Sequence, residues 1–181
     1  PAIGTANTSV YLWGAQLEAG SYATSYIPTD GTTVTRVQDQ YSKTGIGSLI
    51  NSTEGVLFVE MAALSDDLTI REISLSDGTN TNRVELRYAN SVNKIQAVIR
   101  SSGGAIVLQT STPPTITNFN KIAFKYKSGD FALWINGVEV ATNTTSFLTS
   151  GLNRLGLDNG SGGENFYGKV KQLQVFKTAL T

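Results

Sequence analysis

The amino-acid sequence predicts an all-β protein, a two-sheet antiparallel β-sandwich of the jelly-roll kind. Charged residues make up only 15% of the 181 residues, and Thr, Ser, Asn and Gly, which suit strands and turns, take their place. Short segments of alternating apolar and polar residues recur along the chain, separated by turn residues. Because no stretch shows convincing helical periodicity, this spacing favours a sandwich or jelly roll.

The first third of the chain begins with an alternating segment at 10–17, followed by a turn-rich connection that extends to 31. We predict an edge strand at 32–38. Residues 55–64 are the most apolar of the predicted strands, and residues 68–76 form the next one.

Eight further strands are predicted in the rest of the chain, at 83–89, 94–100, 105–110, 121–127, 131–135, 138–141, 152–157 and 166–176. Asn136-Gly137 is the clearest two-residue hairpin signal, because both residue types readily adopt a positive φ. Residues 101–104 have the composition of a second hairpin turn. The sequence therefore predicts strands joined mostly by short turns, as in antiparallel sheets.

Composition excludes several classes of function. Fourteen basic and fourteen acidic residues leave no basic field for nucleic acid, and the short apolar runs argue against membrane insertion. Cysteine is absent, so disulfides are excluded. The absence of histidine removes the usual general base and the commonest metal ligand. The chain begins at Pro1, which we interpret as a fragment of a larger protein.

Three segments of the second half carry a resemblance to a known family. They are FNKIAFKYKSGDFALWINGVEVAT (119–142), LNRLGLDNGSGG (152–163) and FYGKVKQLQVFKTAL (166–180). In this order they resemble the laminin G-like jelly rolls of the concanavalin A-like lectin/glucanase superfamily. The resemblance implies a laminin G-like β-sandwich over 37–181 with one concave sheet, in a superfamily where many members bind glycans.

The segment YLWGAQLEAGSYATSYIPTDGTTVTR (11–36) resembles a different signature, a linker of phage tail and fibre proteins. This resemblance implies that residues 1–36 are the end of an upstream module followed by a linker. The alternative is that they add a strand to the sandwich itself. One face of the predicted strand needs burial in either case, and it consists of Tyr11, Trp13, Ala15 and Leu17.

Catalysis is not expected. Glycoside hydrolysis usually needs two carboxylates on opposite sides of the scissile bond. The glucanases of the resembled superfamily carry theirs on one strand as E-x-D-x-x-E, a spacing that does not occur here. Glu60 is alone in its strand, and Glu72 and Asp77 are five residues apart. Polysaccharide lyases on jelly rolls combine Tyr with His, and His is absent.

Strand alternation predicts a binding face. If the strands at 83–89, 94–100, 121–127 and 131–135 share one sheet, their outward side chains form a groove in which a Trp supplies the apolar surface for a sugar ring. The predicted ligand-binding residues are Trp134, Arg87, Glu85, Gln96, Arg100, Lys125 and Glu139. The same residues also fit an ordinary solvated face or a protein interface.

Calcium is a further expectation that the superfamily implies. Asp77 with Asn80 in one loop, and Asp158 with Asn159 in another, have the oxygen atoms that calcium binds. Loops of this composition are also common turns. No other cofactor is expected.

The preferred hypothesis is a non-catalytic carbohydrate-binding or host-recognition module of a phage virion protein, in a tail or fibre. Its partners would be a glycan or host surface polysaccharide and other virion subunits, including copies of itself. One alternative is a structural or assembly β-sandwich that contacts only protein, on a virion or another extracellular or cell surface. A polysaccharide lyase or glycoside hydrolase is the third hypothesis.

Overall fold

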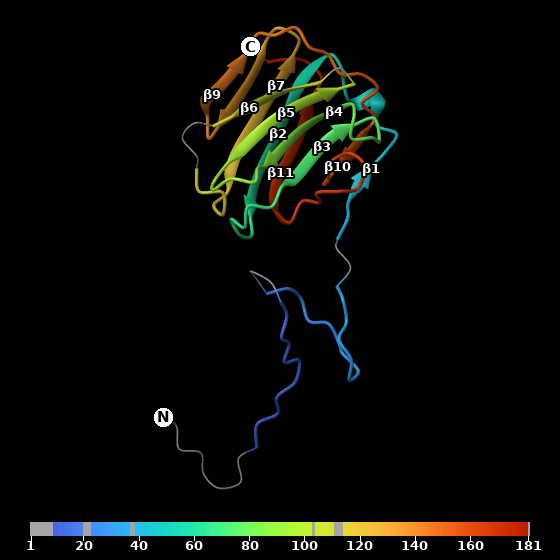
Figure 1. The fold of residues 1–181 in the computed structure, drawn as a ribbon, viewed down its shortest axis with the longest axis vertical. Helices are drawn as coiled ribbons and strands as arrows, with labels where there is room; N and C mark the ends of the chain where they lie inside the picture. The colour runs from blue at the N-terminus through green and yellow to red at the C-terminus, as the bar shows by residue number, and fades with distance from the viewer. Residues whose placement is uncertain (1–8, 20–22, 37–38, 103, 111–113, 181) are drawn as a thin grey trace. The chain divides into compact units, whose positions relative to one another are not determined.

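The computed structural model describes residues 9–19, 23–36, 39–102, 104–110 and 114–180 (Figure 1). The chain divides into two units, 1–38 and 39–181. All eleven strands of the described residues lie in the second unit. No helix in the described part of the chain has the length and hydropathy needed to cross a bilayer.

Two antiparallel sheets form the second unit, which confirms the predicted β-sandwich (Figure 1). The six-stranded sheet consists, in spatial order, of β1 (Ser42–Lys43), β10 (Arg154–Gly156), β3 (Arg71–Ser76), β4 (Arg83–Tyr88), β5 (Ile95–Ser101) and β6 (Gly104–Gln109). The five-stranded sheet consists of β11 (Gly168–Phe176), β2 (Glu54–Ala63), β7 (Asn120–Lys127), β8 (Phe131–Ile135) and β9 (Val138–Asn143). One short 3-10 helix, Gly47–Leu49, precedes β2.

A hydrophobic core fills the space between the two sheets. On β2, Leu57, Val59 and Met61 face inward and are fully buried, as strand alternation requires. The six-stranded sheet contributes Ile73, Leu75, Val84, Leu86, Tyr88, Ile95, Ala97 and Ile99. Each fully buried aliphatic side chain contributes about 1.5–3 kcal/mol. Because these positions are committed to the core, the alternate positions of the same strands are left for function.

The Asn136-Gly137 hairpin joins β8 to β9, as predicted. Both residues have a positive φ, 54° and 84°, which a type I′ turn requires. The Asn136 N–H donates to the Lys121 carbonyl at 2.8 Å, and the Asn136 Oδ1 accepts from the Lys121 N–H at 2.9 Å. The turn is therefore tied to β7, and β7, β8 and β9 form one continuous part of the five-stranded sheet.

The two strands predicted at the start of the chain are wrong. The described residues within 10–17 and 32–38 form no strand, and residues 37–38 lie outside the described part. Tyr11, Trp13 and Leu17 are 92%, 84% and 101% exposed. Alternation produces a stable strand only where a partner strand and a core receive it, and these side chains have neither.

The strand predicted at 68–76 starts three residues later, at Arg71. Leu68 has a φ of 60°, which lies outside the β region and interrupts the extended chain. The assignment of residues 1–36 to an upstream module stays a prediction.

Candidate functional site

The outer face of the six-stranded sheet carries charged and polar side chains on three neighbouring strands. On β4, Val84 and Leu86 point into the core, so the residues between and beside them point outward. The same alternation acts on β3 and β5. We call this surface the charged face; it consists of Glu72, Ser74, Arg83, Glu85, Arg87, Gln96 and Arg100.

Ion pairs connect the two glutamates of the charged face to its three arginines. Arg87 Nη1 and Arg100 Nε lie 3.5 and 3.4 Å from Glu85 Oε1, and Arg83 Nε contacts Glu85 Oε2. Glu72 is 3.1 Å from Arg87 Nη1 and 3.7 Å from Arg83 Nη2. Each arginine is thus held by at least one carboxylate, which limits its motion before any ligand arrives.

The two carboxylates lie beneath the arginines. Glu72 and Glu85 are 0% exposed, whereas the side chains of Arg87 and Arg100 are 14% and 30% exposed. Burial raises the pKa of Glu72, and the nearby Glu85 raises it further, while the arginines oppose both effects. Solvent therefore meets guanidinium groups at this surface, with their counter-charges hidden below.

A loop between β10 and β11, residues 158–165, closes one side of the charged face. Gly160 lies directly against β3, because a Cβ added there would come within 2.9 Å of Ser76 Cβ and 2.6 Å of the Thr79 carbonyl oxygen. Arg83 Nη1 donates to the Asn159 carbonyl at 2.8 Å. The loop is therefore anchored to both β3 and β4.

Glu164 brings a third carboxyl group to this side. Its carbonyl oxygen accepts a hydrogen bond from the Glu72 N–H at 3.0 Å. Burial raises the pKa of Glu164, and the neighbouring Glu72 raises it further. The charged face is therefore bordered by a carboxyl on the β3 side, whereas on the β6 side it is open, with Val107 and Gln109 exposed.

The structure divides the predicted ligand-binding residues between two sheets. Four of them come together on the charged face: Glu85, Arg87, Gln96 and Arg100. The other three lie on the five-stranded sheet: Trp134, Lys125 and Glu139. The prediction of a single groove with Trp134 among the arginines is therefore wrong. The strands β7 and β8, which carry Lys125 and Trp134, pair within the five-stranded sheet and not with the strands of the charged face.

Trp134 is half-buried on the outer face of the five-stranded sheet. Lys125 Nζ lies 5.6 Å from the centre of its ring system and 2.7 Å from Asp130 Oδ1. Glu139 is its register partner on β9. We call this surface the aromatic face; its large apolar side chains are Phe58, Trp134 and Phe176.

Glu72, Ser74 and Arg83 belong to the charged face and were not among the predicted site residues. The signal for them was present in the sequence. Ile73 and Leu75 alternate as core residues, so Glu72 and Ser74 must point outward like their neighbours on β4. What the sequence does not show is the register that sets Glu72 opposite Arg87.

The predicted calcium ligands do not fit a metal site. Asp158 is 2% exposed, and its two carboxylate oxygens accept hydrogen bonds from Arg154 at 2.8 and 2.5 Å. Asp77 and Asn159 accept hydrogen bonds from their own loops, and Asn80 is exposed. Among the described residues no three acidic, His or Cys side chains converge as metal ligation requires.

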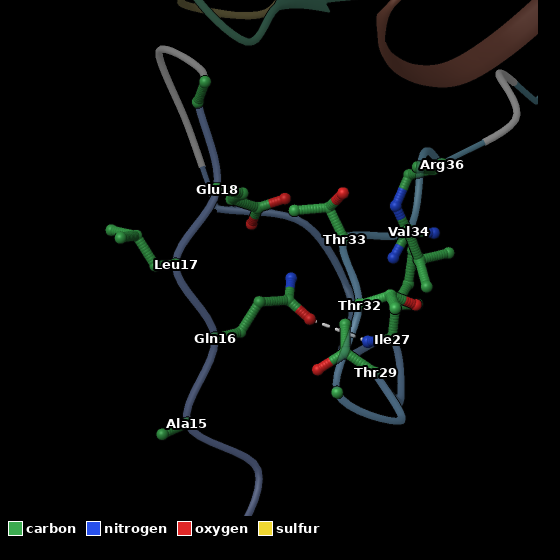
Figure 2. Close-up of a pocket in the computed structure, with 12 residues that line it drawn as sticks. Ala15, Gln16, Leu17, Glu18, Ile27, Thr29, Thr32, Thr33, Val34 and Arg36 are labelled. Carbon is green, nitrogen blue, oxygen red and sulfur yellow. Dashed lines mark hydrogen bonds between the residues drawn. The ribbon is translucent and has the colours of Figure 1, made fainter.

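A hollow in the first unit lies between the arms of the segment 15–36 (Figure 2). Two of its polar side chains bond within the segment. Gln16 Oε1 accepts from the Ile27 N–H at 2.7 Å (Figure 2). Glu18 Oε1 accepts from the Thr24 N–H at 2.6 Å. Leu17, one of the residues that line it, is fully exposed. The hollow therefore presents few ligand-seeking groups compared with the charged face.

A family model described as the concanavalin A-like lectin/glucanases superfamily matches residues 57–181. The match begins within β2 and includes all the strands of the charged face. No curated protein sequence matches the chain.

Several solved structures share the fold. CBM40 of the Ruminococcus gnavus IT-sialidase, bound to α2,3-sialyllactose, has a TM-score of 0.63 at 17% identity and covers 78% of this chain and 94% of its own. Domain 4 of AbnA, a GH43 extracellular arabinanase from Geobacillus stearothermophilus, in complex with arabinotriose, has a TM-score of 0.61 at 17% identity, with coverages of 74% and 65%. The Caenorhabditis elegans galectin LEC-6 has a TM-score of 0.52 at 15% identity, with coverages of 77% and 91%.

Proposed function

Because the chain belongs to the concanavalin A-like lectin/glucanase superfamily, we propose that it is a carbohydrate-binding module and that the charged face holds the sugar. Two similar structures were solved with an oligosaccharide, sialyllactose in one and arabinotriose in the other, which supports a glycan partner. The observation that carries the proposal is the set of arginine and amide donors held at the surface above buried carboxylates.

Sugar recognition needs polar groups whose positions change little on binding. Arg87 Nε donates to Gln96 Oε1 at 2.8 Å, and Gln96 Nε2 donates to Gln109 Oε1 at 2.9 Å. This chain of hydrogen bonds orients the amides before a ligand binds. Beside it, Val107 and Ala105 offer exposed apolar surface for a sugar ring. In this proposal, Val107 and Ala105 supply the apolar surface that the sequence analysis assigned to Trp134.

The proposed module is non-catalytic. Glu72 and Glu85 are the only carboxylates on the strands of the charged face, and both are 0% exposed and paired with arginines. Glycoside hydrolysis usually needs two carboxyl groups at the scissile bond, and with Glu72 and Glu85 buried the exposed Glu164 at the border of the face is, among the described residues, without a second one. A lyase or hydrolase, the third hypothesis from the sequence, therefore has the least support.

A glycan array probed with the full chain, followed by calorimetry on the sugars it binds, tests the proposal. Val107→Asp on β6 is expected to lower affinity, because it replaces apolar surface with a hydrated charge. Val138→Asp is the matched control, an exposed valine on β9, at the edge of the other sheet. Absence of binding to any glycan, or loss of binding only in the control variant, would contradict the proposal.

We also propose that the parent protein is a phage tail or fibre component, that the module recognises host polysaccharide, and that it resides in the virion. The phage-like segment 11–36 supports this, since Tyr11 and Trp13 are exposed and available to a neighbouring module or subunit. The test is to sequence the DNA on both sides of the gene that encodes this chain. Neighbouring genes for virion structure are expected, and a setting among metabolic genes would refute the phage context.

A second candidate function is assembly, in which the aromatic face contacts another copy of the chain. Phe58, Trp134 and Phe176 place three aromatic rings on one sheet surface, a residue type enriched at protein interfaces. Light scattering on the purified chain distinguishes the candidates. An oligomer that Phe176→Glu converts to a monomer supports assembly, whereas a monomeric wild-type chain counts against it.

A further inference from the structure

Resting on the proposed function, we propose that the sugar bound by the charged face carries a carboxylate and that Arg100 binds this group. The ligand class is therefore an acidic glycan, one that contains a uronate or a sialate. Arg100 would be the residue that determines specificity for the acid over its neutral counterpart.

Arg100 is held at one end and free at the other. Its Nε lies 3.4 Å from Glu85 Oε1, and its side chain is 30% exposed. Within the described part of the chain, Nη1 and Nη2 have no hydrogen-bond or ion-pair partner. Two N–H groups in a fixed plane match the two oxygens of a carboxylate, and the anchored Nε reduces the entropy lost on binding.

The other two arginines are committed to the protein. Arg83 is almost fully buried, with Nη1 on the Asn159 carbonyl at 2.8 Å and its other nitrogens beside the glutamates. Arg87 donates its Nε to Gln96 and its Nη1 to Glu72. Of the three guanidinium groups, Arg100 is therefore the one with a complete bidentate edge available to a ligand.

The charge distribution favours an anion on the same side. Three guanidinium groups share two carboxylates, so the network carries an excess of positive charge. The third carboxyl group, Glu164, hydrogen-bonds through its backbone to Glu72 on β3, and β4 lies between that strand and Arg100 on β5. A ligand carboxylate at Arg100 is consequently separated from Glu164, and the nearer carboxylate, Glu85, is neutralised by its ion pairs with the three arginines.

The neighbouring apolar residues fit the rest of such a sugar. On β6, Ala105 lies directly opposite Arg100 of β5. Two residues further along β6, Val107 lies opposite Val98 of β5, which is buried. A ring lying across Ala105 and Val107 brings a carboxylate on its edge toward Arg100. The site thus combines one charged anchor with a small apolar platform.

The test compares each acid with its own methyl ester, using galacturonate trisaccharide and 3′-sialyllactose as probes in calorimetry with the full chain. We expect at least one acid to bind about ten-fold or more tightly than its ester, the gain of one charge-assisted pair. Arg100→Lys keeps the charge but loses the bidentate edge, and should remove most of this preference. Arg36→Gln, in the other unit, is the control and should retain it.

Circular dichroism of Arg100→Lys verifies that the sandwich still folds, and Arg100→Gln serves as a second variant if it does not. Equal binding of acid and ester, or a preference insensitive to both Arg100 variants, overturns this inference but leaves the carbohydrate-binding proposal intact. Preference for a sulfated sugar over both acids also overturns it. Binding of no sugar in any form overturns the inference and the proposed function together.

Discussion

Glu85 on the six-stranded sheet is completely buried among three arginines, whereas Glu60 on the five-stranded sheet pairs with a single lysine, Lys171, whose side chain is 56% exposed. Both glutamates occupy outward positions on their strands, and both sheets follow the same alternation. The difference lies in what surrounds them. On the charged face, neighbouring strands and the loop 158–165 remove water from the ion pairs, but on the aromatic face the ion pairs remain at the surface.

This contrast changes how much each ion pair contributes to the stability of the fold. An exposed ion pair contributes little, because water and salt screen it. A buried pair has lost its hydration, so removal of one partner leaves the other charge without compensation. The charged face should therefore be sensitive to single substitutions in stability as well as in binding, and the aromatic face should tolerate them.

The largest expected effect is that of Glu85→Gln, which leaves Arg83 and Arg87 with Glu72 alone and takes from Arg100 its ion-pair partner. We expect a loss of about 3–5 kcal/mol in the free energy of unfolding, measured by urea denaturation. Glu60→Gln is the matched control on the other face and should cost less than about 1 kcal/mol. Equal losses in the two variants would show that the two faces do not differ in the way we describe.

The next effect concerns the contact between β3 and the loop that borders the charged face. A comparison of Gly160→Ala with Gly162→Ala measures this contact. Both glycines have a positive φ, 91° and 97°, so each substitution strains the backbone by about 1–2 kcal/mol. Only at Gly160 would the new Cβ also meet Ser76 and Thr79, which adds about 1–3 kcal/mol. Thermal unfolding of the two variants measures the difference, and no difference would mean that the loop does not rest on β3.

Trp134→Ala tests the aromatic face. Because the ring is half-buried, we expect a loss of about 1–2 kcal/mol in stability and no change in glycan affinity. Val138→Ala, an exposed position on the same sheet, is the control for stability. A fall in glycan affinity for Trp134→Ala would show that the glycan binds to the aromatic face and not to the charged face.

The smallest effect is a pH dependence at Glu164. Burial and Glu72 raise the pKa of Glu164 above its ordinary 4.5, so the folded protein binds this proton more tightly than the unfolded chain does. The stability that the protonated group contributes is therefore complete below about pH 4.5 and is lost as the pH rises through the raised pKa. Relative to wild type, Glu164→Gln should become more stable as the pH rises above 4.5.

The pKa of Asp77 is shifted in the opposite direction to that of Glu164. Burial raises the pKa of Asp77, but hydrogen bonds from Thr79 and Asn82 outweigh it and hold the pKa below 3.8. Its contribution is therefore present above pH 3.8 and is lost as the pH falls through the lowered pKa. Urea unfolding between acid and neutral pH should show both variants departing from wild type as the pH rises, Glu164→Gln toward higher stability and Asp77→Asn toward lower stability. Parallel curves would contradict both assignments.

Much of the charged face could be predicted because alternation is a local property. Val84 and Leu86 identify the buried positions of β4, so Glu85 and Arg87 were correctly placed on its outward side. The same reasoning, applied to 10–17, failed. There the pattern is present, but the described residues provide no sheet to receive Tyr11 and Trp13, and a strand needs a partner for its backbone groups as well as a core for its side chains.

The amino-acid sequence by itself determined the all-β class, the Asn136-Gly137 hairpin and the outward positions of Glu85, Arg87 and Arg100, since all three depend on neighbours in the chain. Only the tertiary structure decided that Trp134 and Arg100 lie on different sheets, that Glu72 faces Arg87, and that the loop 158–165 covers one side of the charged face. These facts depend on pairing between strands far apart in sequence. Such pairing is selected by the packing of the whole core, which no single segment specifies.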